Sequence, residues 1–314
     1  DAMLATDFRY TEQAATQSPE FRIVRISGPG NDWFKEAVSG SGAKRIGIED
    51  SSMTVSFCST LSQQLKDNAL NAELVHTGPM TSQLRAIKDP QELELLIKAI
   101  DLADQAIENV GGRLRPGMTE REISWDLEKT MRELGADGLS FDMIVASGPN
   151  GAKAHHKPTD RRLEIGDGIV IDMGALYGGY CSDITRTFVL GKASEQFRKI
   201  YDIVLSAQET AEVTAAAGMT GAEVDGLARA VIENAGYGED FGHSLGHGIG
   251  IAVHELPGVG PGSSGTIEDG MVFSVEPGIY LTGWGGVRIE DLVVMEHGTP
   301  RVLTKAHKRD LVVI

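Results

Sequence analysis

The clearest pattern of apolar and polar positions begins at Asp89. Asp89 can cap a helix with Pro90 at its first position, where the missing N–H does no harm. Apolar residues then recur at helical spacing until Gly111-Gly112 ends the pattern. The stripe consists of Leu93, Leu96, Ile97, Ile100, Ala103 and Ile107. A second helix is predicted to begin at Thr119-Glu120-Arg121-Glu122, which has the spacing of a capping box.

Runs of apolar residues after this second helix predict strands, and the same order of predicted helices and strands then repeats. Strands are expected at 143–146, 169–171 and 184–190. Gly117-Met118-Thr119 recurs as Gly218-Met219-Thr220, at an offset of 101 residues, and Asp172-Met173-Gly174 is echoed by Glu276-Pro277-Gly278 at an offset of 104. An internal duplication explains these matches. Each half would run helix, helix, hairpin, and the two halves would contribute to one curved sheet with helices outside.

Residues 1 to 84 have a different pattern, with short alternating strands and helices. Strands are predicted at 21–26 and 45–48, a turn at Gly28–Gly30, a short helix capped by Asn31 that runs through Val38, and a longer helix over 53–65. The region therefore resembles an incomplete α/β domain. Because the chain opens on Asp1 without an initiating methionine, we expect further residues upstream.

Charge and composition narrow the function classes. The 314 residues carry a formal net charge of −16, which argues against a nucleic-acid partner because a phosphate backbone would be repelled. No run of eighteen apolar residues exists, so a membrane partner is not expected. The two cysteines, Cys58 and Cys181, fit no zinc-ribbon spacing, and a reducing cytoplasm is the predicted location.

Four carboxylates at repeated positions are the candidate metal ligands. Asp172 and Asp183 lie in the first hairpin, and Glu276 and Glu290 lie at matching points of the second, all within apolar strand patterns. A carboxylate in such a place needs a positive partner, because burial penalises its charge. Arg186 and Arg288 could compensate two of the four, whereas two divalent cations would balance all of them. The alternative is that these acids form ordinary surface ion pairs.

A histidine-rich segment supplies a candidate fifth ligand. Residues 241–255 contain His243, His247 and His254 among glycines and an alanine, which let a backbone approach a metal or a substrate closely. Four carboxylates with one imidazole make an oxygen-rich set that suits Mn²⁺ or Co²⁺, and Zn²⁺ is also compatible.

These motifs resemble the pita-bread metallopeptidases, in particular the aminopeptidase P and prolidase branch. The resemblance covers residues 85–314, and its most specific motifs include Ser182-Asp183-Ile184-Thr185-Arg186-Thr187 and His243-Ser244-Leu245-Gly246-His247-Gly248. It implies an α+β catalytic domain over 85–314, in which a curved antiparallel sheet is built from duplicated helix-helix-hairpin halves. Residues 1–84 would form part of a creatinase-like α/β domain. It also implies that Asp172 binds one metal, that His247 and Glu276 bind the other, and that Asp183 and Glu290 bridge both.

The resemblance implies further roles outside the metal ligands. His155 would meet the developing oxyanion, His254 would bind substrate near the scissile bond, and His243 and Phe141 would line the pocket. Arg288 would belong to the substrate-binding residues and would hold Glu290 in place. The family usually has proline just before the first of these histidines, whereas this chain has Ala154, so the choice of His155 over its neighbour His156 rests on spacing from Asn150. A homodimer is implied as well.

The expected reaction is hydrolysis of the bond between a first residue and a proline that follows it. A hydroxide bridging the two metals would attack the carbonyl before proline, and Glu276 would act as base and proton shuttle. We expect an Xaa-Pro aminopeptidase. The nearest alternative is an Xaa-Pro dipeptidase (prolidase), but the stretch from Pro277 to Val287 contains no arginine of the kind with which some family dipeptidases hold a free carboxylate. Methionine aminopeptidases, metal-free creatinase-like enzymes and non-catalytic pita-bread modules fit less well.

Overall fold

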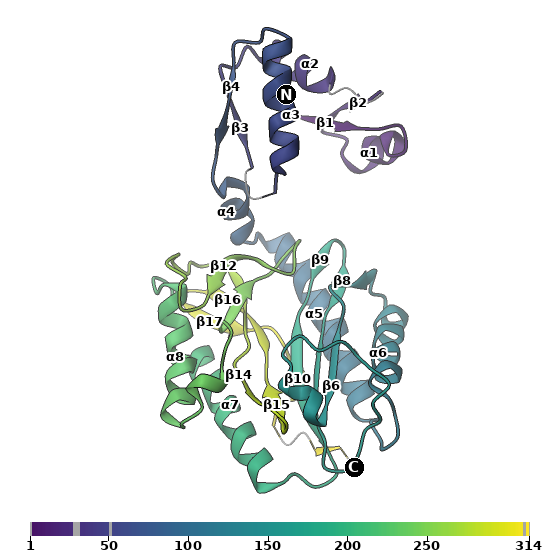
Figure 1. The fold of residues 1–314 in the computed structure, drawn as a ribbon, viewed down its shortest axis with the longest axis vertical. Coiled ribbons are helices and arrows are strands. Elements are labelled where there is room, and N and C mark those ends of the chain that lie inside the picture. Colours follow the sequence, from purple (N-terminus) through teal and green to yellow (C-terminus); the bar gives the residue numbers. More distant parts are fainter. Residues whose placement is uncertain (1, 28–31, 50–51, 310–311, 314) are drawn as a thin grey trace. The chain divides into compact units, whose positions relative to one another are not determined.

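A computed structural model describes residues 2–27, 32–49, 52–309 and 312–313. The chain divides into two compact units, residues 1–81 and 82–314 (Figure 1). The turn predicted at Gly28–Gly30 and the cap predicted at Asn31 lie outside the described residues. None of the described helices combines the length and the apolar character that a membrane-spanning helix needs.

The first unit alternates short strands with helices, as the sequence predicts. Strand β1 pairs in parallel with β2, and β3 pairs in parallel with β4. A small apolar core forms where Phe34 and Val38 of α2 meet Leu61 and Leu65 of α3. The elements are β1 (Met3–Thr6), α1 (Thr11–Gln17), β2 (Arg22–Arg25), α2 (Asp32–Ser41), β3 (Arg45–Ile48), α3 (Val55–Asp67) and β4 (Glu73–His76). Helix α4 (Met80–Ala86) begins in this unit and continues into the second.

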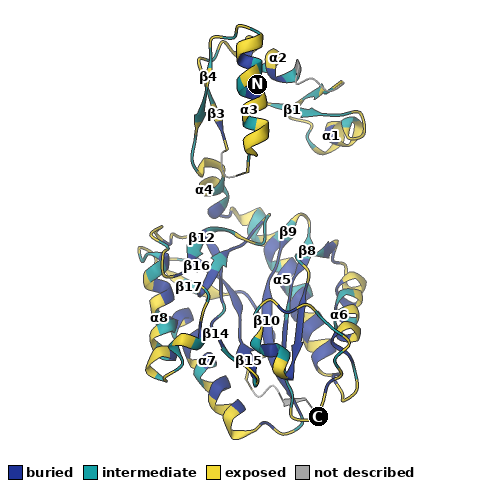
Figure 2. Ribbon diagram, viewed as in Figure 1, coloured by how far each residue is buried: buried dark blue, intermediate teal, exposed yellow. Residues whose placement is uncertain are grey.

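The second unit consists of two halves, each with a pair of helices packed outside its strands (Figure 1). The first half contains α5 (Pro90–Gly111), α6 (Glu120–Leu134), β5 (Gly138–Leu139), β6 (Ile144–Ser147), β7 (Gly168–Met173), β8 (Ala175–Tyr177), β9 (Tyr180–Cys181) and β10 (Ile184–Leu190). The second half contains α7 (Glu195–Thr214), α8 (Gly221–Asn234), β11 (Gly246–Gly248), β12 (Glu255–Val259), β13 (Val272–Val275), β14 (Gly278–Leu281), β15 (Gly285–Arg288), β16 (Asp291–Glu296) and β17 (Thr299–Val302). Strand β18 (Val312–Val313) returns to pair with β10. Each half has its own buried apolar core, which appears as dark blue strands under half-exposed helices in Figure 2.

The helix boundaries follow the capping chemistry. Asp89 caps α5 and Thr119 forms a capping box at the start of α6, both as predicted. Asp89 and Thr220, at the start of α8, form capping boxes as well. In each box the cap side chain accepts from the third backbone N–H of the helix, and a glutamate there accepts from the N–H of the cap residue. Gly135, with φ of 110°, ends α6 in the left-handed conformation that glycine adopts without strain.

The duplication is visible in the hydrogen bonds as well as in the order of elements. In the first half, the start of α6 binds a loop through Glu120 N to Arg161 O and Arg121 N to Thr159 O. In the second half, the start of α8 makes the same two bonds, from Gly221 N to Gly265 O and from Ala222 N to Ser263 O. The strands repeat too, since β7 pairs with β10 as β13 pairs with β16.

The sheet differs from the prediction in one respect, because its ladder is interrupted between the halves. A four-stranded sheet in the order β18-β10-β7-β6 and a five-stranded sheet in the order β12-β11-β13-β16-β17 replace one continuous curved sheet. Side chains bridge the boundary: Thr187 Oγ1 donates to Arg288 O at 2.7 Å and accepts from Arg288 N at 3.1 Å. Glu290 N donates to Thr185 O nearby. We call this contact between the 185–187 and 288–290 segments the seam.

Candidate metal centre

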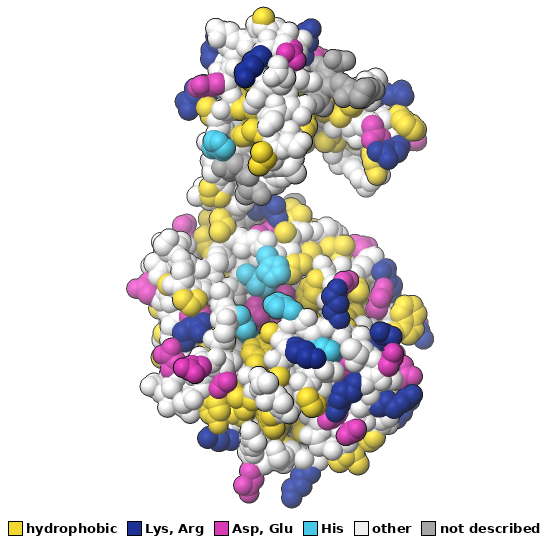
Figure 3. Space-filling model, in the orientation of Figure 1, with side chains coloured by type: hydrophobic (Ala, Val, Ile, Leu, Met, Phe, Trp, Pro, Cys, Tyr) yellow, Lys and Arg dark blue, Asp and Glu magenta, His cyan; other side chains and the backbone are white. Residues whose placement is uncertain are grey.

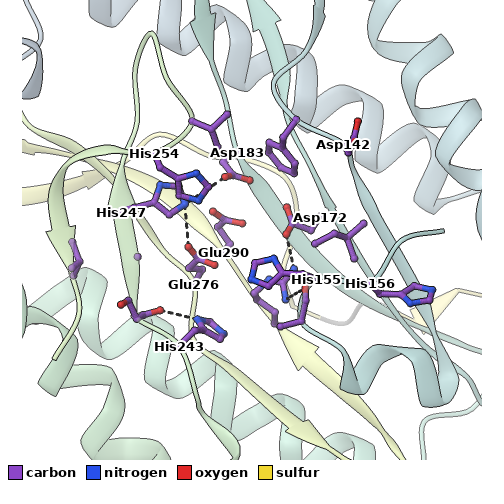
Figure 4. Close-up of a pocket in the computed structure, with 18 of the residues that line it drawn as sticks. Asp142, His155, His156, Asp172, Asp183, His243, His247, His254, Glu276 and Glu290 are labelled. Atoms are coloured by element: carbon purple, nitrogen blue, oxygen red, sulfur yellow. Dashed lines mark hydrogen bonds and ion pairs between the residues drawn. The ribbon is translucent and has the colours of Figure 1, made fainter. Parts of the chain in front are cut away.

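The duplicated strands bring the four predicted carboxylates to the seam. Asp172 lies in β7 and Asp183 directly precedes β10, while Glu276 directly follows β13 and Glu290 directly precedes β16. All four, together with His247 of β11, line one cavity of about 660 Å³ (Figure 4). On the surface of this unit the cavity shows as a hollow in which histidines surround acidic atoms (Figure 3). The five residues predicted to bind metal are therefore brought together.

Three of the acids meet closely enough to share a cation. One carboxylate oxygen from each of Asp172, Asp183 and Glu290 lies within 4.8 Å of the other two. One buried oxygen of each of these residues, Oδ1, Oδ1 and Oε1 respectively, has no hydrogen-bond partner among the described residues. Buried polar atoms are normally paired, and unpaired ones point to a missing partner such as an ion. Carboxylate oxygens are also the donors that hard divalent cations prefer, so the residues present fit such ions.

His247 is oriented so that one ring nitrogen faces the acids. Its Nδ1–H donates to Gly248 O at 3.1 Å, which leaves the Nε2 lone pair free. Nε2 lies 3.3 Å from Glu276 Oε1 and 3.8 Å from Asp183 Oδ2. Burial, and then the neighbouring His254, lowers the pKa of His247 to about 4, so the ring is neutral and can act as a ligand at neutral pH.

The acids repel one another in the absence of cations. Burial raises the pKa of Asp183 well above its ordinary value, and the charges of Glu290 and Asp172 raise it further. Burial likewise raises the pKa of Glu290 well above the ordinary value, followed by the charges of Glu276 and Asp172. Burial also raises the pKa of Glu276, to about 7, although Arg288 opposes the shift. Ionised together, the acids require positive charge in the cavity.

Arg288 contacts one of the acids, Asp172, directly and is linked to a second, Glu290, through a threonine. Its Nη2 donates to Asp172 Oδ2 at 2.5 Å, whereas its link to Glu290 is indirect. Nε donates to Thr185 Oγ1, and Thr185 Oγ1 in turn donates to Glu290 Oε2 at 2.7 Å. That Arg288 holds Glu290 in place stays a prediction, and any such hold acts through Thr185, which stands between the two side chains. Arg186 is fully buried and pairs with Asp291, so it compensates none of the four cavity acids.

The predicted pocket residues also line the cavity, which includes Phe141, His155, His243 and His254. His254 lies against His247, with ring centroids 4.1 Å apart and ring planes inclined at 48°. The two adjacent histidines of the first half separate: His155 lies beside Asp172, while the ring of His156 points away from the acids (Figure 4). His156 is buried, and its Nε2 bonds Glu120 Oε2 at 2.8 Å.

Tyr280 is a cavity residue that the sequence analysis missed. Its hydroxyl accepts from Arg288 Nη1 at 2.7 Å and lies 2.9 Å from His243 Nε2. Because His243 Nδ1–H donates to Ser244 O, Nε2 is the acceptor and Tyr280 is the donor. Burial lowers the pKa of His243 to about 4, in agreement with a neutral ring. The position of Tyr280, two residues after the Glu276-Pro277-Gly278 motif, was the available signal.

Comparisons with known proteins agree with this geometry. The profile of metallopeptidase family M24 matches residues 94–297, and that of the creatinase/prolidase N-terminal domain matches residues 1–87. An Xaa-Pro dipeptidase of Pyrococcus horikoshii is 41% identical over 277 residues, 88% of this chain and 77% of the relative.

Two solved structures are similar over nearly the whole chain. An Xaa-Pro dipeptidase from Bacillus anthracis has a TM-score of 0.93 at 42% identity and covers 99% of this chain and 86% of its own. An X-Pro aminopeptidase from Thermotoga maritima has a TM-score of 0.88 at 40% identity and covers 99% of this chain and 87% of its own. This chain is therefore an enzyme of metallopeptidase family M24, with a pita-bread catalytic domain and a creatinase-like N-terminal domain.

Proposed function

We propose that residues 85–314 hydrolyse Xaa-Pro dipeptides with the help of two divalent cations, as a prolidase does. The observation that carries the proposal is the cluster of Asp172, Asp183 and Glu290, which bring one carboxylate oxygen each within 4.8 Å of the others and each keep a buried oxygen without a hydrogen-bond partner among the described residues. They lie in a cavity of about 660 Å³, a size that suits a small peptide. Similarity to dipeptidases from two organisms favours the dipeptide over our initial expectation of a longer peptide.

Each residue of the centre would have a separate task. Asp172, Asp183, His247, Glu276 and Glu290 would hold the cations, with Asp183 and Glu290 between them. Cations bound there would supply Lewis acidity and a water that ionises at neutral pH. Glu276 would accept a proton from the attacking water and pass it to the proline nitrogen that leaves. His155 and His254 would donate hydrogen bonds to the charge that develops on the carbonyl oxygen.

A free carboxylate distinguishes a dipeptide from a longer peptide, and Lys157 is the cation that could recognise it. Lys157 and Arg288 are the lysine and arginine side chains that line the cavity. Arg288 is committed to Asp172 and Tyr280. Lys157 is exposed, and within the described part of the chain no carboxylate lies within ion-pair distance of it. This lysine could therefore replace the arginine that is missing between Pro277 and Val287.

The deciding experiment compares Gly-Pro, Gly-Pro amide and Gly-Pro-Pro as substrates after metal removal and reloading with Mn²⁺, Co²⁺ or Zn²⁺. We expect Gly-Pro to be the best substrate, and Lys157→Gln to raise its KM roughly tenfold while that of the amide is unchanged. Lys153→Gln is the control, because Lys153 lies on the same loop but donates to Asn150. Preference for Gly-Pro-Pro would instead support an aminopeptidase, in line with the Thermotoga maritima structure.

Oligomeric state and location stay predictions. We propose a homodimer in the cytoplasm, on the resemblance and on the two cysteines alone. Light scattering of the purified protein would measure the oligomeric state, and fractionation of the source cells would show the location.

A further inference from the structure

Glu120 is a buried carboxylate that lies outside the metal centre and that the proposed reaction does not use. It is the first residue of α6 and has no exposed surface. Oε1 accepts from Ser147 N and Ser147 Oγ, both at 2.8 Å, and from Asn150 Nδ2 at 3.0 Å. Oε2 accepts from Thr159 N at 3.0 Å and Thr159 Oγ1 at 2.6 Å, and it bonds His156 Nε2 at 2.8 Å. Both oxygens are therefore fully used.

All these donors belong to one segment, residues 147–159, which we call the histidine loop. The loop leaves β6 at Ser147, passes through the short 3₁₀ helix Gly148–Ala152 and carries His155 into the cavity. Glu120 holds both ends of the loop and also His156, the residue next to His155. In Figure 4 the two rings point to different sides, His155 beside Asp172 and His156 away from it. Anchoring His156 therefore fixes the backbone from which the His155 side chain projects.

The duplication provides a comparison within the same molecule. At the offset of 101 residues, Glu120 corresponds to Gly221, the first residue of α8. Gly221 makes the same backbone bond to its loop as Glu120 does, but a Cβ atom there would lie 2.0 Å from Gly258 O. The second half thus attaches its helix to its loop without any carboxylate. Backbone attachment does not require Glu120, so the carboxylate has another task in the half that contains the histidine loop.

We propose that Glu120 is a positioning residue that holds the histidine loop so that His155 faces the scissile carbonyl. The inference rests on the proposed function, because it assigns His155 the task of meeting the developing oxyanion. A hydrogen-bond donor to an oxyanion is effective only when its geometry is fixed in advance. Misplacement by about 1 Å can cost roughly a hundredfold in rate. His156 is accordingly an anchor of the loop and not a group that touches substrate.

The first test measures loop order in the metal-free protein, without reference to activity. Amide hydrogen exchange of Ser147 and Thr159, which donate to Glu120, should be at least about tenfold faster in Glu120→Gln than in the wild type. Asp104→Asn is the control, because Asp104 is also buried and accepts two backbone N–H groups, those of Lys305 and Ala306. It should leave exchange at Ser147 and Thr159 unchanged. Unchanged exchange in Glu120→Gln would overturn the inference, whether or not the enzyme cleaves Xaa-Pro bonds.

The second test is a double-mutant cycle with the metal-loaded enzyme on Gly-Pro. Glu120→Gln should lower kcat by roughly 10- to 100-fold with little change in KM. In a His155→Ala background, Glu120→Gln should lower kcat less than about threefold further, because the side chain that Glu120 positions is already absent. Additive losses would show that Glu120 acts elsewhere and would refute the inference. A wild type that cleaves no Xaa-Pro substrate would refute the proposed function instead, and the exchange result would still stand.

A milder pair of variants covers the possibility that Glu120→Gln does not fold. His156→Ala removes one of the six donors, whereas His156→Gln retains an N–H that can reach Glu120. We expect His156→Ala to lower kcat and His156→Gln to restore most of it. Equal kcat values for the two variants would contradict an anchoring role.

Discussion

The Asp183→Asn variant separates the stability of the metal-free protein from metal binding. Asp183 is buried next to Glu290 and Asp172, and its pKa is raised well above the ordinary 3.8. A carboxyl group that must stay protonated in the native state costs stability at every pH above the pKa of the unfolded chain. Each unit by which the native-state pKa exceeds that of the unfolded chain adds about 1.4 kcal/mol to this cost at high pH. Asparagine has almost the same shape and does not titrate, so it removes the cost.

The sign of the pH dependence follows from the same shift. Below about pH 4 Asp183 is protonated in both states, and the two proteins should have similar stability. As the pH rises, the unfolded wild type loses its proton first, so the native state is progressively disfavoured, whereas the variant is unaffected. In the metal-free state at pH 7 we therefore expect Asp183→Asn to melt at a higher temperature than the wild type, and the difference to shrink as the pH falls to 4.

Thermal unfolding from pH 4 to pH 8, after chelation and again with Mn²⁺, measures both effects. With Mn²⁺ at about a hundred times its Kd the wild type should gain about 2.7 kcal/mol, and the variant should gain much less. Asp225→Asn is the matched control: Asp225 is equally buried but paired with Arg229 at 2.6 Å, so its loss should destabilise by roughly 3 kcal/mol. If Asp183→Asn destabilised the metal-free protein at pH 8 as Asp225→Asn does, charge repulsion within the cavity would be the wrong description.

Three further predictions concern neighbouring groups. Burial alone would raise the pKa of Glu120, but the hydrogen bonds that it accepts outweigh burial and lower the pKa to about 2. These bonds come from Thr159, Asn150, His156 and Ser147. Between pH 5 and pH 2 the free energy of unfolding of the wild type, measured with urea, should therefore fall by about 3 kcal/mol relative to that of Glu120→Gln. Tyr280→Phe leaves Arg288 Nη1 and His243 Nε2 without the hydroxyl that joins them, so it should lower the free energy of unfolding by about 2 kcal/mol. The control Tyr177→Phe should change the free energy of unfolding by less than about 0.5 kcal/mol. Gly246→Ala places a Cβ atom 1.9 Å from Ser274 O and therefore pushes apart the strands that carry His247 and Glu276. Calorimetry should show Mn²⁺ binding at least about tenfold weaker in this variant. Gly242→Ala, which has open space around its Cβ, should bind Mn²⁺ as the wild type does.

Much of the fold could be predicted from interactions between residues that are close together in the sequence. Asp89, Thr119 and the repeat of Gly117-Met118-Thr119 predict the helix starts, because capping depends on a few adjacent residues. The cluster of cavity acids was predictable for a related reason, since four carboxylates in apolar strands, at matching points of a duplication, would be too costly to bury together without cations. These inferences required only spacing along the chain.

The partners of the arginines and of Glu120 were not predictable in this way. Arg288 is two residues from Glu290, yet it donates to Asp172, which lies 116 residues away, because the seam turns its side chain toward the other half. Glu120 looks like an ordinary acid in the first turn of a helix, where the dipole favours it. Its partners become apparent only when the loop from Ser147 to Thr159 is folded over it. Pairings of this kind depend on how segments distant in sequence meet.

The seam also determines when a newly made chain can acquire its cations. Its side-chain bonds join residues 101 to 105 positions apart, such as Thr187 with Arg288 and Thr185 with Glu290. A chain synthesised only as far as α7 carries Asp172 and Asp183 but neither of the acids that will face them. Contacts so distant in sequence form late, because the intervening loop must first be closed. We therefore expect ion capture to be among the last events of biosynthesis, and prematurely terminated products to be inert toward peptides.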